Sequence, residues 1–587
     1  MADLLAAGLN RHLAGHLQEA RETYRFVLAV DPRQADALHL LGVSFLDEQP
    51  GQAESFIRQA IACDPRNPLY HTNLGLALRN QQRGEEALAT CDKALRLKPD
   101  YPEAHVNRGL TLLSLQRRED AVAAFGAALA IQPDLAAALI HRGETLLYLG
   151  RFEAAVADYD RLLAVAPDDV GALNNRGLAL LELKRVDEAL ASFQRALALA
   201  PDLAEVVNSC GSALRAMGRL DEALACFTRA AALQPGYVEA VVNRGLALQD
   251  LARFDEALAS YAEARDIRPD DALAHWNEAT LRLLTGDLPG GFAEAEWRLR
   301  VPALGIVPPT FAQPLWLGDT PLGGRTILVH ADLGLGDTIH FARYIPMLAA
   351  RGARVVAKVQ TPLRTLIAAM DGISQCVGRD EPLPDFDVHC PLSSLPLAFG
   401  TTLDGIPART PYLSAPAASA AWRERLGTDD RPKIGVVWSG NARHANDRNR
   451  SIPLETLQPL FDCEATFVSL QTELREGDDA ALRTQGNCVM AGRFFADFSD
   501  TAAVIADLDL VITVDTSAAH LAGALRRPVW ILLPFVPDWR WLLDREDSPW
   551  YPSARLFRQG AERRWEPVID RVRRALAVEV AAGRSRR

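Results

Sequence analysis

A 34-residue period in the placement of proline constrains this chain more than any other feature. The first step between these prolines is 33 residues and each of the next six is 34 residues. The prolines are Pro32, Pro65, Pro99, Pro133, Pro167, Pro201, Pro235 and Pro269. A fixed period of this length is typical of a solenoid made from one repeated pair of helices, with proline closing the second helix. We therefore predict an all-α solenoid of about eight repeats over residues 1–285.

Two more columns keep the same phase. Glycine recurs at Gly75, Gly109, Gly143, Gly177, Gly211 and Gly245, and the pair Ala-x-x-x-Phe/Tyr recurs from Ala121/Phe125 to Ala257/Tyr261. The small residues allow two helices to approach closely, and we expect the aromatic ring to fill the space between neighbouring units. The pattern resembles the tetratricopeptide repeat (TPR).

A column of amides lies two residues before the glycine position. Its members are Asn73, Asn107, Asn175, Asn243 and Asn277, with His141 and Ser209 in phase. Because an amide both donates and accepts, such a row could hold an extended peptide by its backbone. The column resembles the asparagine ladder of the O-linked N-acetylglucosamine transferases, and these five asparagines are candidate acceptor-binding residues. Bonds to the neighbouring repeat, or helix capping, would fit the same spacing.

The period breaks down after residue 285. Residues 286–322 begin with a stretch that we interpret as a helix covering the open end of the solenoid, since an exposed apolar end would be unstable in water. The remainder of this segment is rich in proline and glycine, which predicts an ordered linker.

From residue 325 the chain changes character. Short apolar β-rich runs alternate with helical stretches, at 326–330, 354–359, 434–439, 465–470, 509–514 and 528–533. Runs this apolar predict strands buried on both faces, hence parallel sheets with helices on either side. We predict an α/β part with two Rossmann-like lobes, residues 323–415 and 430–560, facing each other across a cleft. Residues 561–587 would form a C-terminal helix and basic tail.

The first polar cluster is 333-LGLGDT-338, which follows a predicted strand. It is not a dinucleotide fingerprint, because Ile339 occupies the third glycine position. The loop does supply a turn at Gly336 and a carboxylate, Asp337, at the start of a helix. A helix N-terminus favours the ionised form of a carboxylate, which suits a general base. Simple helix capping is the alternative.

The second cluster is 513-TVDTSAAHLAGAL-525. Asp515, Thr516 and Ser517 open a helix directly after a strand, where free N–H groups and hydroxyls form an anion site suited to a diphosphate. His520, on the next turn, could contact a phosphate or a sugar. Capping and ordinary packing are the alternatives for these residues.

The third cluster is the basic loop 438-WSGNARHANDRNRSIP-453. Arg443 and Arg450 could neutralise a departing diphosphate, although a solvated basic loop would look the same. We interpret the two Asp-x-Asp pairs, 385–387 and 507–509, as turn residues and predict no metal. The aromatic stretch 534–552 could line the donor site through Trp539 or Trp541, but we favour a packing role for it.

At these clusters the chain resembles the heptosyltransferase type of glycosyltransferase (glycosyltransferase family 9), which has the two-lobed GT-B fold. The glycine–aspartate turn of that family is matched by Gly336 and Asp337. Its D-T-G-x-x-H motif is matched by 515-DTSAAH-520, with serine where glycine is usual. Its K-x-W-P-like segment is matched by 450-RSIP-453, with arginine for lysine and isoleucine for tryptophan. The resemblance covers residues 325–560.

This resemblance implies sugar transfer from a nucleotide-sugar donor, with inversion and without a metal or other cofactor. Asp337 would be the general base. Gly336, Arg443, Arg450, Asp515, Thr516, Ser517 and His520 would bind the donor. The acceptor would be a protein or peptide held by the repeats. Two alternatives stay open: a non-catalytic scaffold with a degenerate transferase part, and a transferase that acts on a glycan or lipid-linked acceptor.

Composition restricts the remaining possibilities. The formal net charge is −12 with a pI near 5.6, which argues against a nucleic-acid partner. The eight cysteines include no C-x-x-C pair, so we expect reduced thiols. No apolar run reaches the length of a membrane span, and the N-terminal sequence lacks the pattern of a signal peptide. We therefore expect a cytoplasmic protein.

Overall fold

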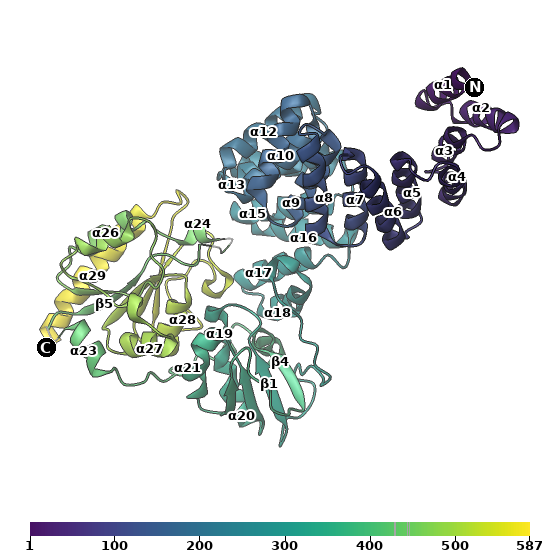
Figure 1. Cartoon of the computed structure of the whole chain (residues 1–587). Coiled ribbons are helices and arrows are strands. Elements are labelled where there is room, and N and C mark those ends of the chain that lie inside the picture. The colour runs from purple at the N-terminus through teal and green to yellow at the C-terminus, as the bar shows by residue number, and fades with distance from the viewer. Residues whose placement is uncertain (428–429, 443, 445, 587) are drawn as a thin grey trace. The chain divides into compact units, whose positions relative to one another are not determined.

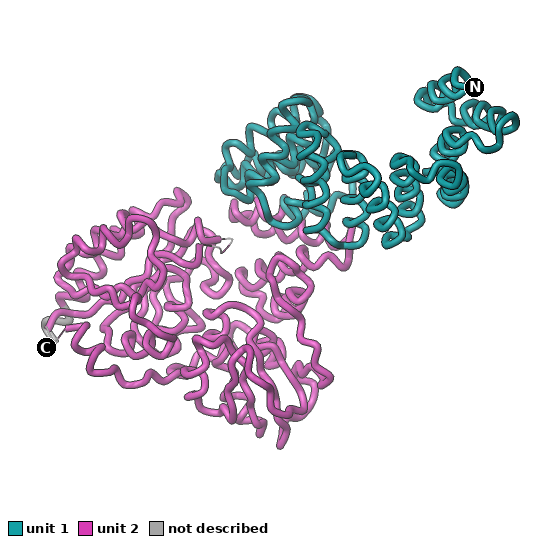
Figure 2. The backbone as a smooth tube through the Cα atoms, in the orientation of Figure 1, with its two compact units in different colours: residues 1–243 teal, residues 244–587 magenta. Residues whose placement is uncertain are grey.

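A computed structural model describes residues 1–427, 430–442, 444 and 446–586 (Figure 1). The chain forms two compact units, Met1–Asn243 and Arg244–Arg587, which Figure 2 shows in different colours. Among the described residues, no helix is both long enough and apolar enough to cross a bilayer.

Unit 1 is built from successive helix pairs. The two helices of a pair pack on each other, and each pair packs on the next. Each second helix ends two residues before one of the periodic prolines, where the missing N–H of proline does not disrupt a helix. The helices are α1 Ala2–Leu13, α2 Leu17–Val30, α3 Ala35–Val43, α4 Pro50–Cys63, α5 Pro68–Asn80, α6 Gly84–Leu97, α7 Pro102–Ser114, α8 Arg118–Ile131, α9 Ala136–Tyr148, α10 Phe152–Val165, α11 Val170–Glu182, α12 Val186–Leu199, α13 Ala204–Ala216, α14 Leu220–Leu233 and α15 Val238–Asp250, which continues into unit 2.

The periodic glycines are contact points between the two helices of a pair. A Cβ added to Gly109 of α7 would lie 2.7 Å from Cδ1 of Phe125 in α8, well inside normal contact distance. Phe125 is fully buried and also faces His141 of the next pair, with ring centroids 6.0 Å apart. The aromatic column therefore fills space both within one repeat and between repeats.

This packing predicts different outcomes for two glycines that lie close together in sequence. We expect Gly109→Ala to lower the free energy of unfolding by about 1–3 kcal/mol, because the added methyl overpacks the contact with Phe125. Gly126 lies within α8, and a Cβ there would have as its nearest neighbour Nη1 of Arg142, at 3.5 Å. Gly126→Ala should raise the free energy of unfolding by about 0.4–1 kcal/mol. Chemical unfolding followed by circular dichroism measures both, and equal effects would contradict this account.

Unit 2 begins with the end of α15 and the last helices of the repeat series. These are α16 Phe254–Ile267, α17 Ala272–Leu284 and α18 Leu288–Glu294, followed by the 3-10 turns η1 Ala295–Arg300 and η2 Pro302–Leu304. Trp297 of η1 stacks on His275 of α17, with centroids 4.0 Å apart. Further along, Trp316 is buried and its backbone N–H donates to the carbonyl of His389 at 2.8 Å. The predicted linker is thus anchored on a sheet.

The first sheet has the strand order β3-β2-β1-β4, and every neighbouring pair is parallel. Together with its helices it is called the first lobe here. Its strands are β1 Thr326–His330, β2 Arg354–Lys358, β3 Ile373–Val377 and β4 Val388–Pro391, and its helices are α19 Leu335–Phe341, α20 Ile345–Ala350, α21 Arg364–Ala368 and α22 Leu395–Ala398.

The second sheet has the order β10-β9-β8-β5-β6-β7, again with parallel pairing throughout. It forms the second lobe. Its strands are β5 Lys433–Val437, β6 Thr466–Ser469, β7 Cys488–Met490, β8 Leu510–Val514, β9 Val529–Leu533 and β10 Ala554–Arg558, and its helices are α23 Ala420–Leu426, α24 Asp447–Arg450, α25 Leu454–Leu457, α26 Asp478–Arg483, α27 Phe498–Ala506, α28 Ser517–Ala524 and α29 Glu566–Arg586. The C-terminal region is therefore an α/β structure with parallel sheets, as predicted.

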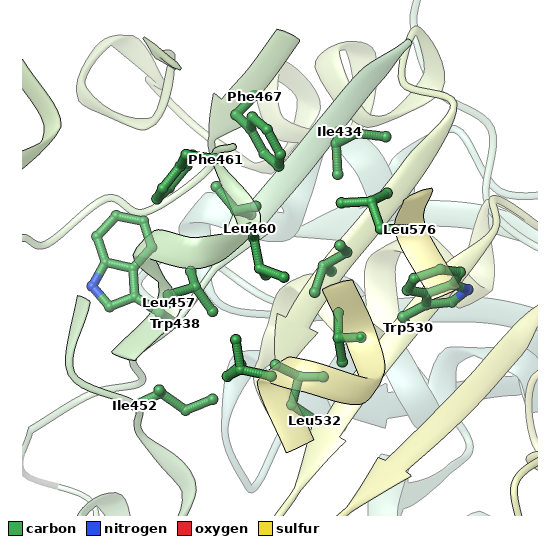
Figure 3. Packing of buried hydrophobic residues seen from close by; sticks show 14 of the residues in the cluster. Ile434, Trp438, Ile452, Leu457, Leu460, Phe461, Phe467, Trp530, Leu532 and Leu576 are labelled. Carbon is green, nitrogen blue, oxygen red and sulfur yellow. The ribbon is translucent and has the colours of Figure 1, made fainter. Parts of the chain in front are cut away.

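A hydrophobic cluster fixes the last helix to the second sheet. Figure 3 shows Leu576 of α29 in one cluster with Ile434 and Leu532 of the sheet and with Trp438 and Phe467. Each of these side chains is almost completely buried. Helix α29 is thus part of the core of the second lobe.

A buried arginine joins η1 to the first lobe. Arg298 is 1% exposed, and its Nε donates to Asp332 Oδ2 at 2.8 Å. Its Nη1 donates to Glu296 Oε1 at 2.7 Å and its Nη2 to Ser394 Oγ at 2.7 Å. Asp332 follows β1 and Ser394 follows β4, so the network lies at the carboxyl ends of two adjacent strands. Residues 286–300, expected to cover the end of the repeats, therefore also hold the first lobe.

Candidate active site

Helices α19 and α28 bring the two lobes together (Figure 1). Helix α19 follows β1 in the first lobe, and α28 follows β8 in the second. A Cβ added to Gly336 would lie 3.0 Å from Cδ2 of His520 and 3.5 Å from the Cα of Ser517. Glycine therefore permits the approach, and the carboxyl ends of strands in both sheets meet here. The predicted residues Gly336, Asp337, Ser517 and His520 therefore lie close together at this junction.

Asp337 is the carboxylate that the first lobe contributes. Its Oδ2 accepts the N–H of Gly334 at 3.0 Å, which caps α19, and its Oδ1 accepts from Nη2 of Arg540 in the second lobe. Burial raises the pKa of Asp337 although Arg540 opposes the shift. A helix N-terminus alone would lower that pKa, so burial outweighs it. Capping is thus observed, and the side chain also reaches the second lobe.

Arg540 comes from the aromatic stretch 534–552, for which the sequence favoured packing. Its Nη1 donates to Asp538 Oδ1 at 2.9 Å, and its guanidinium lies 4.3 Å from the ring of Trp539. The ring of Trp541 stacks on His520 with centroids 5.5 Å apart and an interplanar angle of 13°. The stretch therefore packs in the core and lines the site at the same time. Its arginine was not among the residues predicted from the sequence.

The start of α28 lies at the carboxyl end of β8. Thr516 is the N-cap residue, but its side chain does not cap the helix, since its Oγ1 lies 3.1 Å from Thr513 Oγ1. Burial, reinforced by the carboxylate of Asp538, raises the pKa of Asp515 to about 7, although Arg540 and Arg450 oppose the shift. The capping alternative therefore does not describe Thr516, and the first N–H groups of α28 have no side-chain cap from this residue.

Arg450 lies beside the same turn. Its Nη1 donates to the carbonyl of Asp515 at 3.1 Å. A Cβ on Gly440 would lie 2.5 Å from Nη2 of Arg450, so this glycine leaves the space that the arginine uses. The structure thus brings Arg450 to the predicted diphosphate position. Arg443, predicted with it, lies outside the described residues.

His520 is buried and shares a partner with a second histidine. Its Nδ1 lies 3.0 Å from the hydroxyl of Tyr551, which also lies 3.1 Å from Nδ1 of His340. The pKa values of both histidines lie well below the ordinary value, because burial and the charges of Arg343 and Arg540 disfavour the cation. Both rings are therefore neutral near pH 7. The Nδ1 edge of His520 is satisfied internally, whereas its Cδ2–Nε2 edge lies toward Gly336.

The two Asp-x-Asp pairs lie at the opposite edges of the sheets. Asp387 Oδ2 accepts the N–H of Thr326 at 2.7 Å, and Asp509 Oδ2 accepts the N–H of Lys433 at 2.8 Å. Each carboxylate thus binds the first N–H of a neighbouring strand. The part of the chain that the structure describes holds no cluster of three or more His, Cys, Asp or Glu side chains arranged for a metal ion.

The predicted amide column divides into two groups. Asn73 Nδ2 lies 2.8 Å from Nε2 of His39, and Asn243 Nδ2 donates to Asn208 Oδ1 at 3.0 Å. These two amides bond the preceding repeat, as the alternative interpretation expected. Asn277 Nδ2 is buried and has no partner among the described residues. Asn175 Oδ1 lies 3.5 Å from Nδ2 of Asn174, and its side chain also acts on the hydroxyl of Tyr159. The backbone carbonyl of Asn107 accepts from Thr111 Oγ1, and its side-chain amide has no hydrogen bond to another described residue.

Comparison with known families identifies the repeats. Tetratricopeptide repeat profiles match residues 13–68, 75–116, 102–135, 140–204, 211–272 and 242–296. This N-terminal part of the chain therefore consists of tetratricopeptide repeats, which confirms the prediction from the proline period.

Individual proteins and structures resemble parts of the chain. Protein FlbA of Caulobacter vibrioides is 28% identical over 338 residues, which cover 52% of this chain and 56% of FlbA, less than two thirds of its length. A tetratricopeptide repeat protein of Parabacteroides merdae is 21% identical and covers 42% of this chain and 97% of its own, with a TM-score of 0.34. The TPR protein YrrB, described as having an unusual peptide-binding site, is 26% identical over 31% of this chain and 95% of its own, with a TM-score of 0.28.

The amide column leads to a prediction about stability. We expect Asn243→Ala to lower the free energy of unfolding by about 0.5–1.5 kcal/mol, because it removes the bond to Asn208 between repeats. Asn107→Ala is the matched control and should change it by less than about 0.5 kcal/mol. Chemical unfolding of the two variants gives the comparison. A larger loss at Asn107 would show that its amide supports the fold rather than being free for a ligand.

Proposed function

We propose that this protein is a GT-B glycosyltransferase that moves a sugar from a nucleotide-sugar donor to a protein or peptide acceptor held by the repeats. The observation that carries the proposal is the juxtaposition of Asp337, from the first lobe, with the start of α28, from the second. Asp337 accepts from Arg540, and Arg450 donates to the carbonyl of Asp515 at the start of α28, so a carboxylate, a helix start and two arginines lie at this junction. Three elements that serve one displacement reaction are hard to explain in a scaffold.

The proposed reaction is a single displacement. The acceptor hydroxyl oxygen forms a bond to the anomeric carbon of the sugar while the bond from that carbon to the diphosphate oxygen breaks, so the configuration inverts. Asp337 takes the proton of the hydroxyl, and its raised pKa makes it a stronger base than an ordinary aspartate. The N–H groups that open α28, together with Arg450, stabilise the negative charge on the departing nucleoside diphosphate. The scheme needs no metal ion.

The acceptor class is supported by the repeats. Among the described residues, the side-chain amide of Asn107 has no hydrogen-bond partner in the fold and remains able to pair with a peptide backbone, whereas Nδ2 of Asn277 is buried and out of reach of such a ligand. The internal bonds of Asn73 and Asn243 shorten the proposed ladder. They favour, as a second candidate, a glycan or lipid-linked acceptor for which the repeats only dock the enzyme.

Substitution of the proposed base tests the activity. A thermal-shift screen of the full chain against UDP-, GDP-, ADP-, CMP- and dTDP-sugars should first identify a donor that stabilises the protein. With that donor, we expect Asp337→Asn to lower sugar transfer, followed as release of the nucleoside diphosphate, by at least about 100-fold, because general-base catalysis is lost. The variant should still bind the donor.

The control and the contrary results are distinct. Asp509→Asn removes a carboxylate at the far edge of the second sheet and should keep full transfer if the variant folds. No stabilisation by any donor would favour the scaffold. Normal turnover in Asp337→Asn would remove this residue from the mechanism while leaving the transferase assignment in place.

A further inference from the structure

Arg540 is shared between carboxylates of the two lobes. Its Nη2 donates to Asp337 of the first lobe, and its Nη1 donates to Asp538 of its own loop at 2.9 Å. The side chain is 8% exposed, and its Nε has no hydrogen-bond partner among the described residues. A guanidinium offers five N–H donors, so this group keeps capacity that the two acids do not use.

The surroundings of Arg540 suit a phosphate group. The ring of Trp539 supports the guanidinium plane at 4.3 Å, and its charge acts on Asp515 and His520 at the start of α28. Arg450 is held at the same turn by the carbonyl of Asp515. Two planar guanidinium groups therefore border one helix start, and such groups bind phosphate oxygens through paired hydrogen bonds.

An N–H of Arg540 that is bonded to Asp337 cannot be bonded to a diphosphate oxygen at the same time. We infer that Arg540 is a diphosphate-binding residue of the donor site and that it exchanges Asp337 for the diphosphate when the donor binds. This inference rests on the proposed function. A diphosphate carries more negative charge than one carboxylate and offers several oxygens to the guanidinium N–H groups. The exchange therefore favours binding of the nucleotide-sugar.

The exchange links donor binding to the base. While Arg540 holds Asp337, the positive charge of the guanidinium lowers the pKa of the carboxyl group and so opposes the rise that burial causes. When the guanidinium turns to the diphosphate, Asp337 loses its cation and becomes the stronger base that the acceptor hydroxyl requires. Donor binding therefore comes before deprotonation of the acceptor.

Pyrophosphate, the part common to nucleoside-diphosphate sugars, is the probe for this exchange. Calorimetric titration should compare the full chain with Asp337→Asn, Arg540→Gln and the double variant. We expect Asp337→Asn to bind pyrophosphate about tenfold more tightly, because Arg540 is released from an internal competitor, and Arg540→Gln to bind at least about tenfold more weakly. In the double variant the gain from Asp337→Asn should disappear. Simple removal of a negative charge would give the same gain with or without Arg540.

Arg540→Lys keeps the buried charge but not the fork, and replaces Arg540→Gln throughout if the latter does not fold. Equal pyrophosphate affinity in wild type and Asp337→Asn would overturn the exchange and leave the transferase proposal standing. A gain from Asp337→Asn that persists without Arg540 would also overturn it. If none of the proteins binds pyrophosphate, both the diphosphate site and the exchange are wrong.

Discussion

The close approach of α19 to α28 at Gly336 is the constraint on which the candidate site depends. Parallel sheets collect polar residues at the carboxyl ends of their strands, but two separate sheets give two separate edges. Here a residue without a side chain allows one edge to lie against the other, with His520 and Ser517 in contact distance. The ion pair between Asp337 and Arg540 then crosses the junction. Without that contact, each lobe would hold only half of the chemistry proposed here.

A buried polar cluster supports this junction from behind. The hydroxyl of Tyr551 serves His340 of the first lobe and His520 of the second, and Nη1 of Arg343 donates to the carbonyl of Trp550 at 2.9 Å. Hydrogen bonds inside such a cluster are worth more than at the surface, and loss of one partner leaves another buried and unsatisfied. The neutral histidines avoid adding charge to a region that already holds buried arginines. The same cluster fixes the ring of His520, whose other edge faces Gly336.

Sequence patterns identified those strands of the fold whose residues form an unbroken apolar run. Strands β1, β2, β5, β6, β8 and β9 are apolar runs and were predicted, whereas β3, β4, β7 and β10 were not. β3 is partly exposed, β4 ends in a proline, β7 has only three residues and β10 contains two arginines. In the site, Asp337 and Asp515 follow predicted strands and could be found. Arg540 follows no strand, and its partner Asp337 is 203 residues away, so no local pattern indicated the contact.

The link between the repeats and the candidate base follows from how the first lobe is held. Asp332, which accepts from the buried Arg298, lies between β1 and Asp337. A buried ion pair gains little net stability but is costly to break, because removal of one partner leaves a charge unpaired in the interior. The ion pair therefore fixes the loop that contains Asp332 to η1. Trp297 of η1 in turn stacks on His275 of α17. Within unit 2, the last repeat helices and the loop that carries Asp337 are thus parts of one packed structure.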